Sequence, residues 1–214
     1  MPSWAARSAL LARRYFFCIT YVIQTQTPYR RTPLTAITSG EILLKYSVSA
    51  GSGNTTAGTA ATSLGDQIST TAWAGGSVND LFDDISGAEN AASTVDYRCV
   101  LVHNSNASNA LQNAVVYLSA EVAGGAGITI AVDNIAASAI GAATAQAAAI
   151  ATETTAPTGV GAFSAPTTAG TGLALGSIPS GSCRAVWVKR TATNSAALSA
   201  DGVTIGISGD TGSL

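Results

Sequence analysis

Charged residues are scarce in this 214-residue sequence. The 10 Lys and Arg and the 12 Asp and Glu make up 10% of the chain, against about 25% in an average soluble protein. Five of the basic residues lie in the first 31 positions and no acidic residue precedes Glu41, so residues 41–214 carry five basic against 12 acidic side chains. A nucleic-acid groove needs clustered Lys and Arg to neutralise phosphates. This balance therefore argues against nucleic acid as a partner.

Histidine and cysteine are equally few. His103 is the single histidine, and the chain has no Gly-x-Ser-x-Gly motif, so nothing indicates a serine or cysteine nucleophile with its base. The three cysteines, Cys18, Cys99 and Cys183, lack Cys-x-x-Cys spacing, which makes neither a zinc site nor a disulfide framework. For Cys99 and Cys183, which fall in expected strands, we predict two buried free thiols rather than a disulfide. The sequence thus predicts no catalytic residues and no cofactor.

The N-terminal region contains no hydrophobic run long enough to cross a membrane. Its apolar segment, residues 15–23, spans nine residues, whereas a membrane-spanning helix needs roughly 20, and we expect no membrane partner. Residues 1–40 are Arg-rich and acid-free, unlike the rest of the chain. They are interpreted as a translation from too early a start codon or a disordered tail, as a targeting signal, or as a folded arm. No small-x-small cleavage site follows the apolar run closely.

The pattern of residues 41–214 predicts short strands separated by turns rich in Gly, Asn and Ser. In residues 97–103, Tyr97, Cys99, Leu101 and His103 share one face of the expected strand. Trp187 has apolar neighbours and is expected in the core. The expected strands cover residues 41–46, 97–103, 111–119, 127–132, 183–190 and 203–207. This pattern predicts an all-β fold, an antiparallel β-sandwich of jelly-roll or immunoglobulin-like type spanning residues 41–214, preceded by a non-conforming N-terminal extension at residues 1–40.

The connections carry further expectations. Residues 104–109 are a strong turn signal, so we expect residues 97–103 and 111–119 to form a hairpin. The Ser-, Thr- and Gly-rich residues 49–71 predict a mobile surface loop. The Ala-rich residues 135–151 contain no charge that would solvate an exposed helix face, and they predict an extended loop with a short strand near residues 146–151.

Acidic residues cluster in one place only, around Asp80, Asp83, Asp84 and Glu89. Carboxylate oxygens this close in sequence make a weak candidate site for Ca²⁺, which accepts six to eight oxygen ligands. The spacing is not that of an EF-hand loop. We favour a solvated turn in which Leu81, Phe82 and Ile85 pack inward, and we expect no metal.

Several blocks of the sequence carry a resemblance to a known family. The blocks are Asn-Asp-Leu-Phe-Asp-Asp-Ile-Ser-Gly (79–87), Asp-Tyr-Arg-Cys-Val-Leu-Val-His-Asn (96–104), Thr-Ala-Pro-Thr-Gly-Val (155–160), Ala-Val-Trp-Val-Lys-Arg (185–190), Asp-Gly-Val-Thr-Ile (201–205) and Gly-Asp-Thr (209–211). In this order they resemble a family of phage and prophage virion structural proteins. The likeness spans roughly residues 41–213 and does not extend to residues 1–40, which favours the start-codon interpretation. It implies a small β-rich particle protein and no catalytic residues.

The resulting expectation is a non-enzymatic bacteriophage virion structural protein, a capsid decoration or stabilising subunit located in the virion. Its expected partners are other virion proteins, either the major capsid protein or tail proteins. We also expect a homo-oligomer on a symmetric lattice, where many modest contacts add up. Exposure alone suggests three contact regions: residues 49–71, 80–89 and 135–151.

Two other functions remain open from the sequence. One is an exported bacterial adhesin or carbohydrate-binding module, with residues 1 to about 26 as its signal. The other is a hydrolase that uses an acid pair drawn from Asp83, Asp84, Glu89 and Asp96.

Overall fold

The computed structural model describes residues 36–196, 198 and 201–212, and the interpretations of residues 1–35 lie outside this range. The chain divides into two units, Met1–Pro33 and Leu34–Leu214, of which the second holds every described residue. Within it Ile37 already belongs to the fold, because its backbone N–H donates to Thr211 Oγ1 at 3.0 Å.

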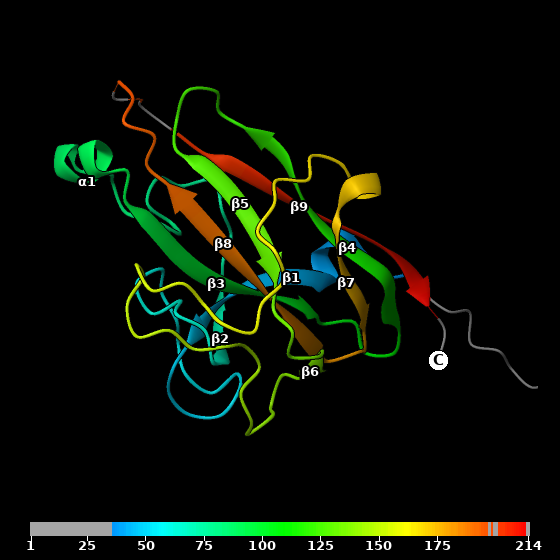
Figure 1. The fold of residues 1–214 in the computed structure, drawn as a ribbon. Coiled ribbons are helices and arrows are strands. Elements are labelled where there is room, and N and C mark those ends of the chain that lie inside the picture. Colours follow the sequence, from blue (N-terminus) through cyan, green and yellow to red (C-terminus); the bar gives the residue numbers. More distant parts are fainter. Residues whose placement is uncertain (1–35, 197, 199–200, 213–214) are drawn as a thin grey trace, which may run out of the picture. The chain divides into compact units, whose positions relative to one another are not determined.

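The described chain is almost entirely β, with nine strands in two antiparallel sheets (Figure 1). The strands are β1 (Ile42–Val48), β2 (Gln67–Ala72), β3 (Val95–Asn104), β4 (Ala110–Glu121), β5 (Gly127–Val132), β6 (Ser138–Ala139), β7 (Leu173–Ile178), β8 (Ser182–Thr191) and β9 (Val203–Gly212). One α-helix, α1 (Gly87–Ala92), and two 3₁₀ turns, η1 (Ser39–Glu41) and η2 (Ala169–Thr171), complete the elements. No described helix has the length and apolarity to cross a membrane.

The large sheet has the strand order β2-β1-β3-β8-β5, with β6 pairing onto β8, and the small sheet has the order β7-β4-β9. The two sheets pack face to face through a shared hydrophobic core, which confirms the predicted antiparallel β-sandwich. Apolar side chains alternate along the strands as expected: Val100 and Val102 of β3 and Val186 and Val188 of β8 all point between the sheets. Across from them lie Val116 and Leu118 of β4 and Leu175 and Ile178 of β7.

The opposite face of the large sheet is also buried, in a second cluster around Trp187. Cys99 and Leu101 point to this face, as the alternation predicts, and Trp187 is fully buried among them, which confirms its place in the core. Two loop regions cover the face. In Figure 1 the cyan and yellow-green loops lie on the side of the large sheet away from β4 and β9.

The first covering loop corrects the prediction of a mobile surface loop at residues 49–71. Its last residues form β2, Ser63 and Ile68 are fully buried, and Gly65 lies so close to the Ala-rich segment that an added Cβ would stand 1.8 Å from Ala148 O. Glycine and serine occur here because the loop packs tightly against its neighbours.

The second covering loop, residues 135–151, is extended, as predicted. It contains the short β6, and the strand expected near residues 146–151 is reduced to a single bridge between Gly65 and Ala149. Gln146 is buried at its centre, where its Oε1 accepts from Ile68 N at 2.8 Å and its Nε2 donates to Ala139 O at 2.8 Å. This amide joins the two loops into a third layer over the large sheet.

The predicted hairpin of residues 97–103 and 111–119 is wrong. Both edges of β3 are occupied, by β1 and β8, while β4 pairs with β7 and β9 in the other sheet. The chain between β3 and β4 therefore crosses from one sheet to the other. Buried Asn104 holds this crossing, because its Nδ2 donates to Asn109 O at 2.8 Å and to Ile178 O at 3.0 Å. The final strand also runs further than expected, through to Gly212.

Cys99 and Cys183 are buried free thiols, as predicted. Burial raises the pKa of Cys99 well above its ordinary value and raises that of Cys183 to about 12. For a pKa of about 12 the reactive thiolate is roughly 10⁻⁴ of the population at pH 8. We expect iodoacetamide at pH 8 to leave both thiols unmodified in the folded protein and to alkylate both in guanidinium, as mapped by peptide mass spectrometry. Equal labelling rates in the two states would contradict this.

Candidate functional site

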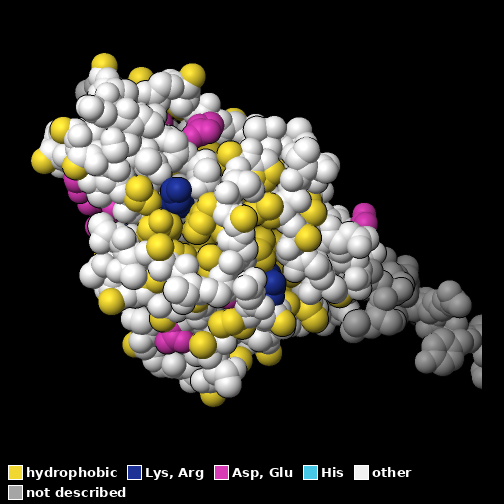
Figure 2. Space-filling model, in the orientation of Figure 1, with side chains coloured by type: hydrophobic (Ala, Val, Ile, Leu, Met, Phe, Trp, Pro, Cys, Tyr) yellow, Lys and Arg dark blue, Asp and Glu magenta, His cyan; other side chains and the backbone are white. Residues whose placement is uncertain are grey.

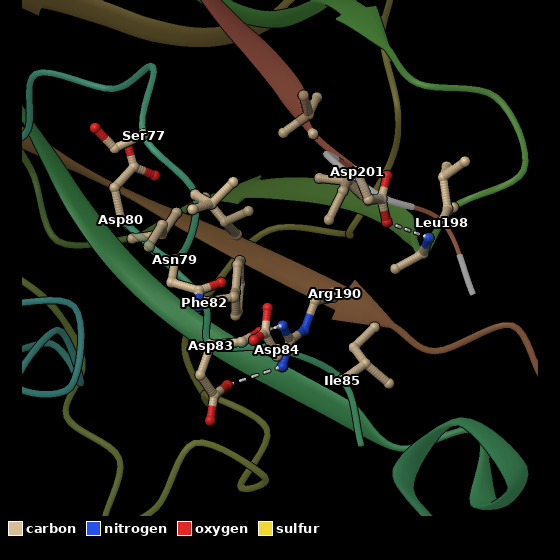
Figure 3. A pocket seen from close by; sticks show the side chains of 18 of the residues that line it. Ser77, Asn79, Asp80, Phe82, Asp83, Asp84, Ile85, Arg190, Leu198 and Asp201 are labelled. Carbon is tan, nitrogen blue, oxygen red and sulfur yellow. Dashed lines mark hydrogen bonds and ion pairs between the residues drawn. The ribbon is translucent and has the colours of Figure 1, made fainter. Parts of the chain in front are cut away.

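A pocket of about 820 Å³ lies at one end of the sandwich, and we call it the end pocket. The segment between β2 and α1, residues 73–86, forms one wall, and Leu198 with residues 201–205 at the start of β9 forms the other. The ends of β5 and β8 contribute the floor. Figure 3 shows Asp83, Phe82 and Ile85 from the first wall facing Leu198 and Asp201 across the pocket, with Arg190 between them.

The end pocket lies over the exposed margin of the core between the sheets. Leu81 and Val188 are core residues, and Ile128, Val203 and Ile205 pack partly buried against the same core. All five line the pocket. The pocket therefore opens onto apolar side chains that the two sheets alone do not cover completely.

Arg190, near the end of β8, holds the wall in place. Its Nε and Nη2 donate to Asp96 Oδ2 on the neighbouring β3 at 3.1 and 2.7 Å, and both side chains are almost fully buried. The same guanidinium donates to the backbone oxygen of Asp83 and, at 3.2 Å, to the Asp83 carboxylate. It also lies 4.8 Å from the centre of the Phe82 ring. Arg190 is thus fully engaged in structural contacts.

Each wall has a further anchor. Tyr46 Oη donates to the backbone oxygen of Asp80 at 2.6 Å. On the other side Asp201 Oδ2 accepts from Ala126 N at 2.7 Å. Gly125 makes that contact possible, because an added Cβ would stand 2.0 Å from Asp201 Oδ1. The walls are therefore tied to the sheets at defined points, and the pocket is preformed.

Carboxylates line the walls. Asp83 and Asp84 are exposed on the first wall, Asp80 is half-buried there, and Asp201 is exposed on the second. Arg190 is the one basic residue among the described residues that line the pocket, and Asp96 already neutralises it. The pocket is consequently acidic.

Exposed large apolar side chains gather at the same place. Among the described residues, Val78 (76% exposed), Leu198 (43%) and Val122 (41%) are the large hydrophobic side chains that face solvent. Val78 and Leu198 line the end pocket, and Val122 lies beside it, with its N–H donating to Gly202 O of the second wall at 2.9 Å. On the face of the molecule that Figure 2 shows, charged side chains are few and yellow side chains lie around the dark blue basic ones.

The candidate calcium residues are not brought together. Asp80, Asp83 and Asp84 line the pocket, but Glu89 belongs to the capping box of α1, where its Oε2 accepts from Ser86 N at 2.7 Å. Hydrogen bonds from the Ser86 side chain and backbone lower the pKa of Glu89. The described residues contain no group of three or more His, Cys, Asp or Glu that could hold a metal ion. As expected for the turn, Leu81 is buried and Phe82 and Ile85 are half-buried.

The residues considered for hydrolysis are engaged as well. Asp96 is paired with Arg190 inside the protein, and Asp83 shares that guanidinium. His103 is 6% exposed, and burial, together with the charge of Lys45, lowers its pKa. His103 faces the loop layer, on the side of β3 away from the small sheet, because it shares a strand face with Cys99 and Leu101.

Sequence reasoning found the acidic wall but missed the second wall, Arg190 and the two exposed apolar residues. The neighbouring Asp201 and Gly202 stood in a block singled out for resemblance, and Arg190 ended another. Nothing in the sequence indicated that these blocks meet in space.

The fold and the pocket together define an antiparallel β-sandwich protein with a pocket at one end. Comparisons with protein-family models, with curated proteins and with solved structures find no match for this chain.

Proposed function

We propose that this chain is a non-enzymatic structural protein of a bacteriophage virion, a capsid decoration or stabilising subunit. The observation that supports it best is how the protein uses its few ionisable residues. Arg190, Asp96, Arg98 and Glu153 form ion pairs within the fold, and Asp133 accepts backbone hydrogen bonds. The described surface offers instead an acidic and apolar pocket suited to contact with another protein.

The blocks that resemble virion proteins support the same proposal by their positions. Residues 79–87 form most of the first wall of the end pocket, residues 185–190 form the end of β8 beneath it, and residues 201–205 form the second wall. Three blocks, the first ending at residue 87 and the second beginning only at residue 185, thus surround one pocket. Such convergence is what a shared binding surface requires, since a surface is built from residues distant in the chain.

The three contact regions expected from the sequence fare differently. Much of residues 49–71 and 135–151 packs on the large sheet and is not available for contact, whereas residues 80–85 line the pocket. We therefore place the particle contact at the end pocket.

The proposal predicts regular labelling of particles in electron microscopy. Particles are induced from the strain that encodes this chain, purified by density, and incubated with gold-labelled antibody against the protein. Gold spread evenly over the capsid, or along the tail, is the expected result. Unlabelled particles, with the protein recovered from the secreted or envelope fraction, would favour an exported adhesin or carbohydrate-binding module.

A further inference from the structure

We propose that the end pocket binds a basic segment of a neighbouring protein that also carries a large apolar side chain. The inference rests on the proposed function only in naming that neighbour as a virion protein. The nature of the segment follows from the pocket itself.

Exposed hydrophobic side chains are concentrated at the end pocket. A monomeric soluble protein exposes single apolar residues in scattered positions, but here Val78, Leu198 and Val122 all lie in or beside one pocket. Beneath them the core margin of Ile128 and Ile205 is also accessible from the pocket. Burial of a partner's apolar side chain among these residues removes apolar surface from water on both sides, which favours association.

Negative charge predominates in the end pocket. The pocket walls carry Asp80, Asp83, Asp84 and Asp201, and the one described guanidinium among its lining residues belongs to Arg190. Because Asp96 is bonded to that guanidinium at 2.7 Å, the described lining residues offer no free positive group with which to attract an anion. Complementary charge steers encounter and disfavours partners of the same sign, so the fitting segment contains Lys or Arg.

The same charges make other occupants unfavourable. Two copies docked pocket to pocket would bring eight carboxylates together at one interface, a like-charge contact that is costly. A phosphate-rich ligand would meet the same repulsion. Hydrogen bonds from Tyr46, Arg190 and Ala126 hold the two walls in place. Because these walls are already ordered, binding of the segment has a smaller entropy cost.

The test uses a random nine-residue peptide library, selected on the immobilised full-length protein. We expect enriched peptides that combine Lys or Arg with a large apolar residue, and we expect their affinity to fall as salt rises. In fluorescence anisotropy the double variant Val78→Ser with Leu198→Ser should bind about tenfold more weakly, the size of effect typical of truncating an apolar anchor. Asp83→Asn with Asp84→Asn should weaken binding several-fold and flatten its salt dependence.

Asp210→Asn is the matched control, since it removes an exposed carboxylate from the far end of β9 and should bind like the wild type. Enrichment of acidic or uncharged peptides, equal binding by all variants, or no enrichment at all would overturn the inference. So would a concentration-dependent dimer that the Val78 and Leu198 substitutions abolish, because a second copy would then be the occupant. If the protein is present in particles but selects no basic peptides, this inference is wrong and the proposed function stands. If the protein selects basic peptides but is absent from particles, the proposed function is wrong and this inference stands.

Discussion

Replacing Arg190 by Met should lower the free energy of unfolding by about 3–5 kcal/mol, the range found when one partner of a buried ion pair is removed. The Arg190 side chain is 8% exposed and that of Asp96 is 6% exposed. Without the guanidinium, the Asp96 carboxylate stays buried with no positive partner. The first wall of the end pocket also loses the hydrogen bond that Arg190 donates to Asp83 O. Equilibrium unfolding in urea measures the change.

Two variants identify the cause of that loss. Asp83→Asn removes the second acidic partner of the same guanidinium. Because the Asp83 side chain is 68% exposed and surface ion pairs contribute little, this variant should lower the free energy of unfolding by at most about 1 kcal/mol. Arg190→Met combined with Asp96→Leu should recover much of the stability, since no buried charge is then left alone. If the free energy of unfolding of Arg190→Met lies within about 1 kcal/mol of the wild-type value, the structural role of this pair is contradicted.

The second large effect is expected at Asp133, which follows β5 and is fully buried. Its Oδ1 accepts from Ile135 N at 2.9 Å, and its Oδ2 accepts from Ala148 N at 2.8 Å and from Trp187 Nε1 at 3.0 Å. Asp133→Ala leaves the buried Trp187 N–H and two part-buried backbone N–H groups without this acceptor. A fully buried unmet group costs about 1–3 kcal/mol, and a part-buried one costs less. We therefore expect a loss of about 3 kcal/mol in unfolding free energy.

The position of the three donors adds a local signature. Two belong to the ends of the Ala-rich loop and the third to Trp187, so amide hydrogen exchange should accelerate across residues 135–150 before the sheets open. Asn134→Ala, which truncates the exposed neighbouring side chain, should change stability by less than about 0.5 kcal/mol. Unchanged exchange in the Asp133→Ala protein would show that this carboxylate does not hold the loop.

What the sequence predicted well is local. The alternation in residues 97–103 correctly placed Cys99 and Leu101 on one face of their strand, because side-chain direction in a strand follows directly from position. The all-β class follows from the same pattern repeated along the chain.

What the sequence did not predict is which strands pair. The turn signal at residues 104–109 was real, but a turn is also compatible with a crossing between sheets. The buried side chain of Asn104 stabilises that crossing by bonding to Asn109 O and Ile178 O, and the second of these contacts depends on a strand that comes much later in the chain. Strand partners are fixed by such distant contacts, which a local pattern does not record.

The end pocket was half predictable for the same reason. Asp80, Asp83 and Asp84 stand together in the sequence and were recognised as a group, although calcium binding was the chemistry considered for them. Arg190, which bonds to Asp83 from beneath, lies 107 positions from it in the sequence. Its meeting with Asp83 and Asp96 required the pairing of β3 with β8. Only the folded chain shows that the acidic turn faces an apolar surface.

The most direct test of the virion proposal is quantitative mass spectrometry of density-purified particles induced from the strain that encodes this chain. The account predicts this protein at high copy in a fixed ratio to the major capsid or tail protein, with peptides that cover residues 41–214. Its absence from the particles, together with its recovery from the secreted or envelope fraction and cleavage near residue 26, would contradict the account.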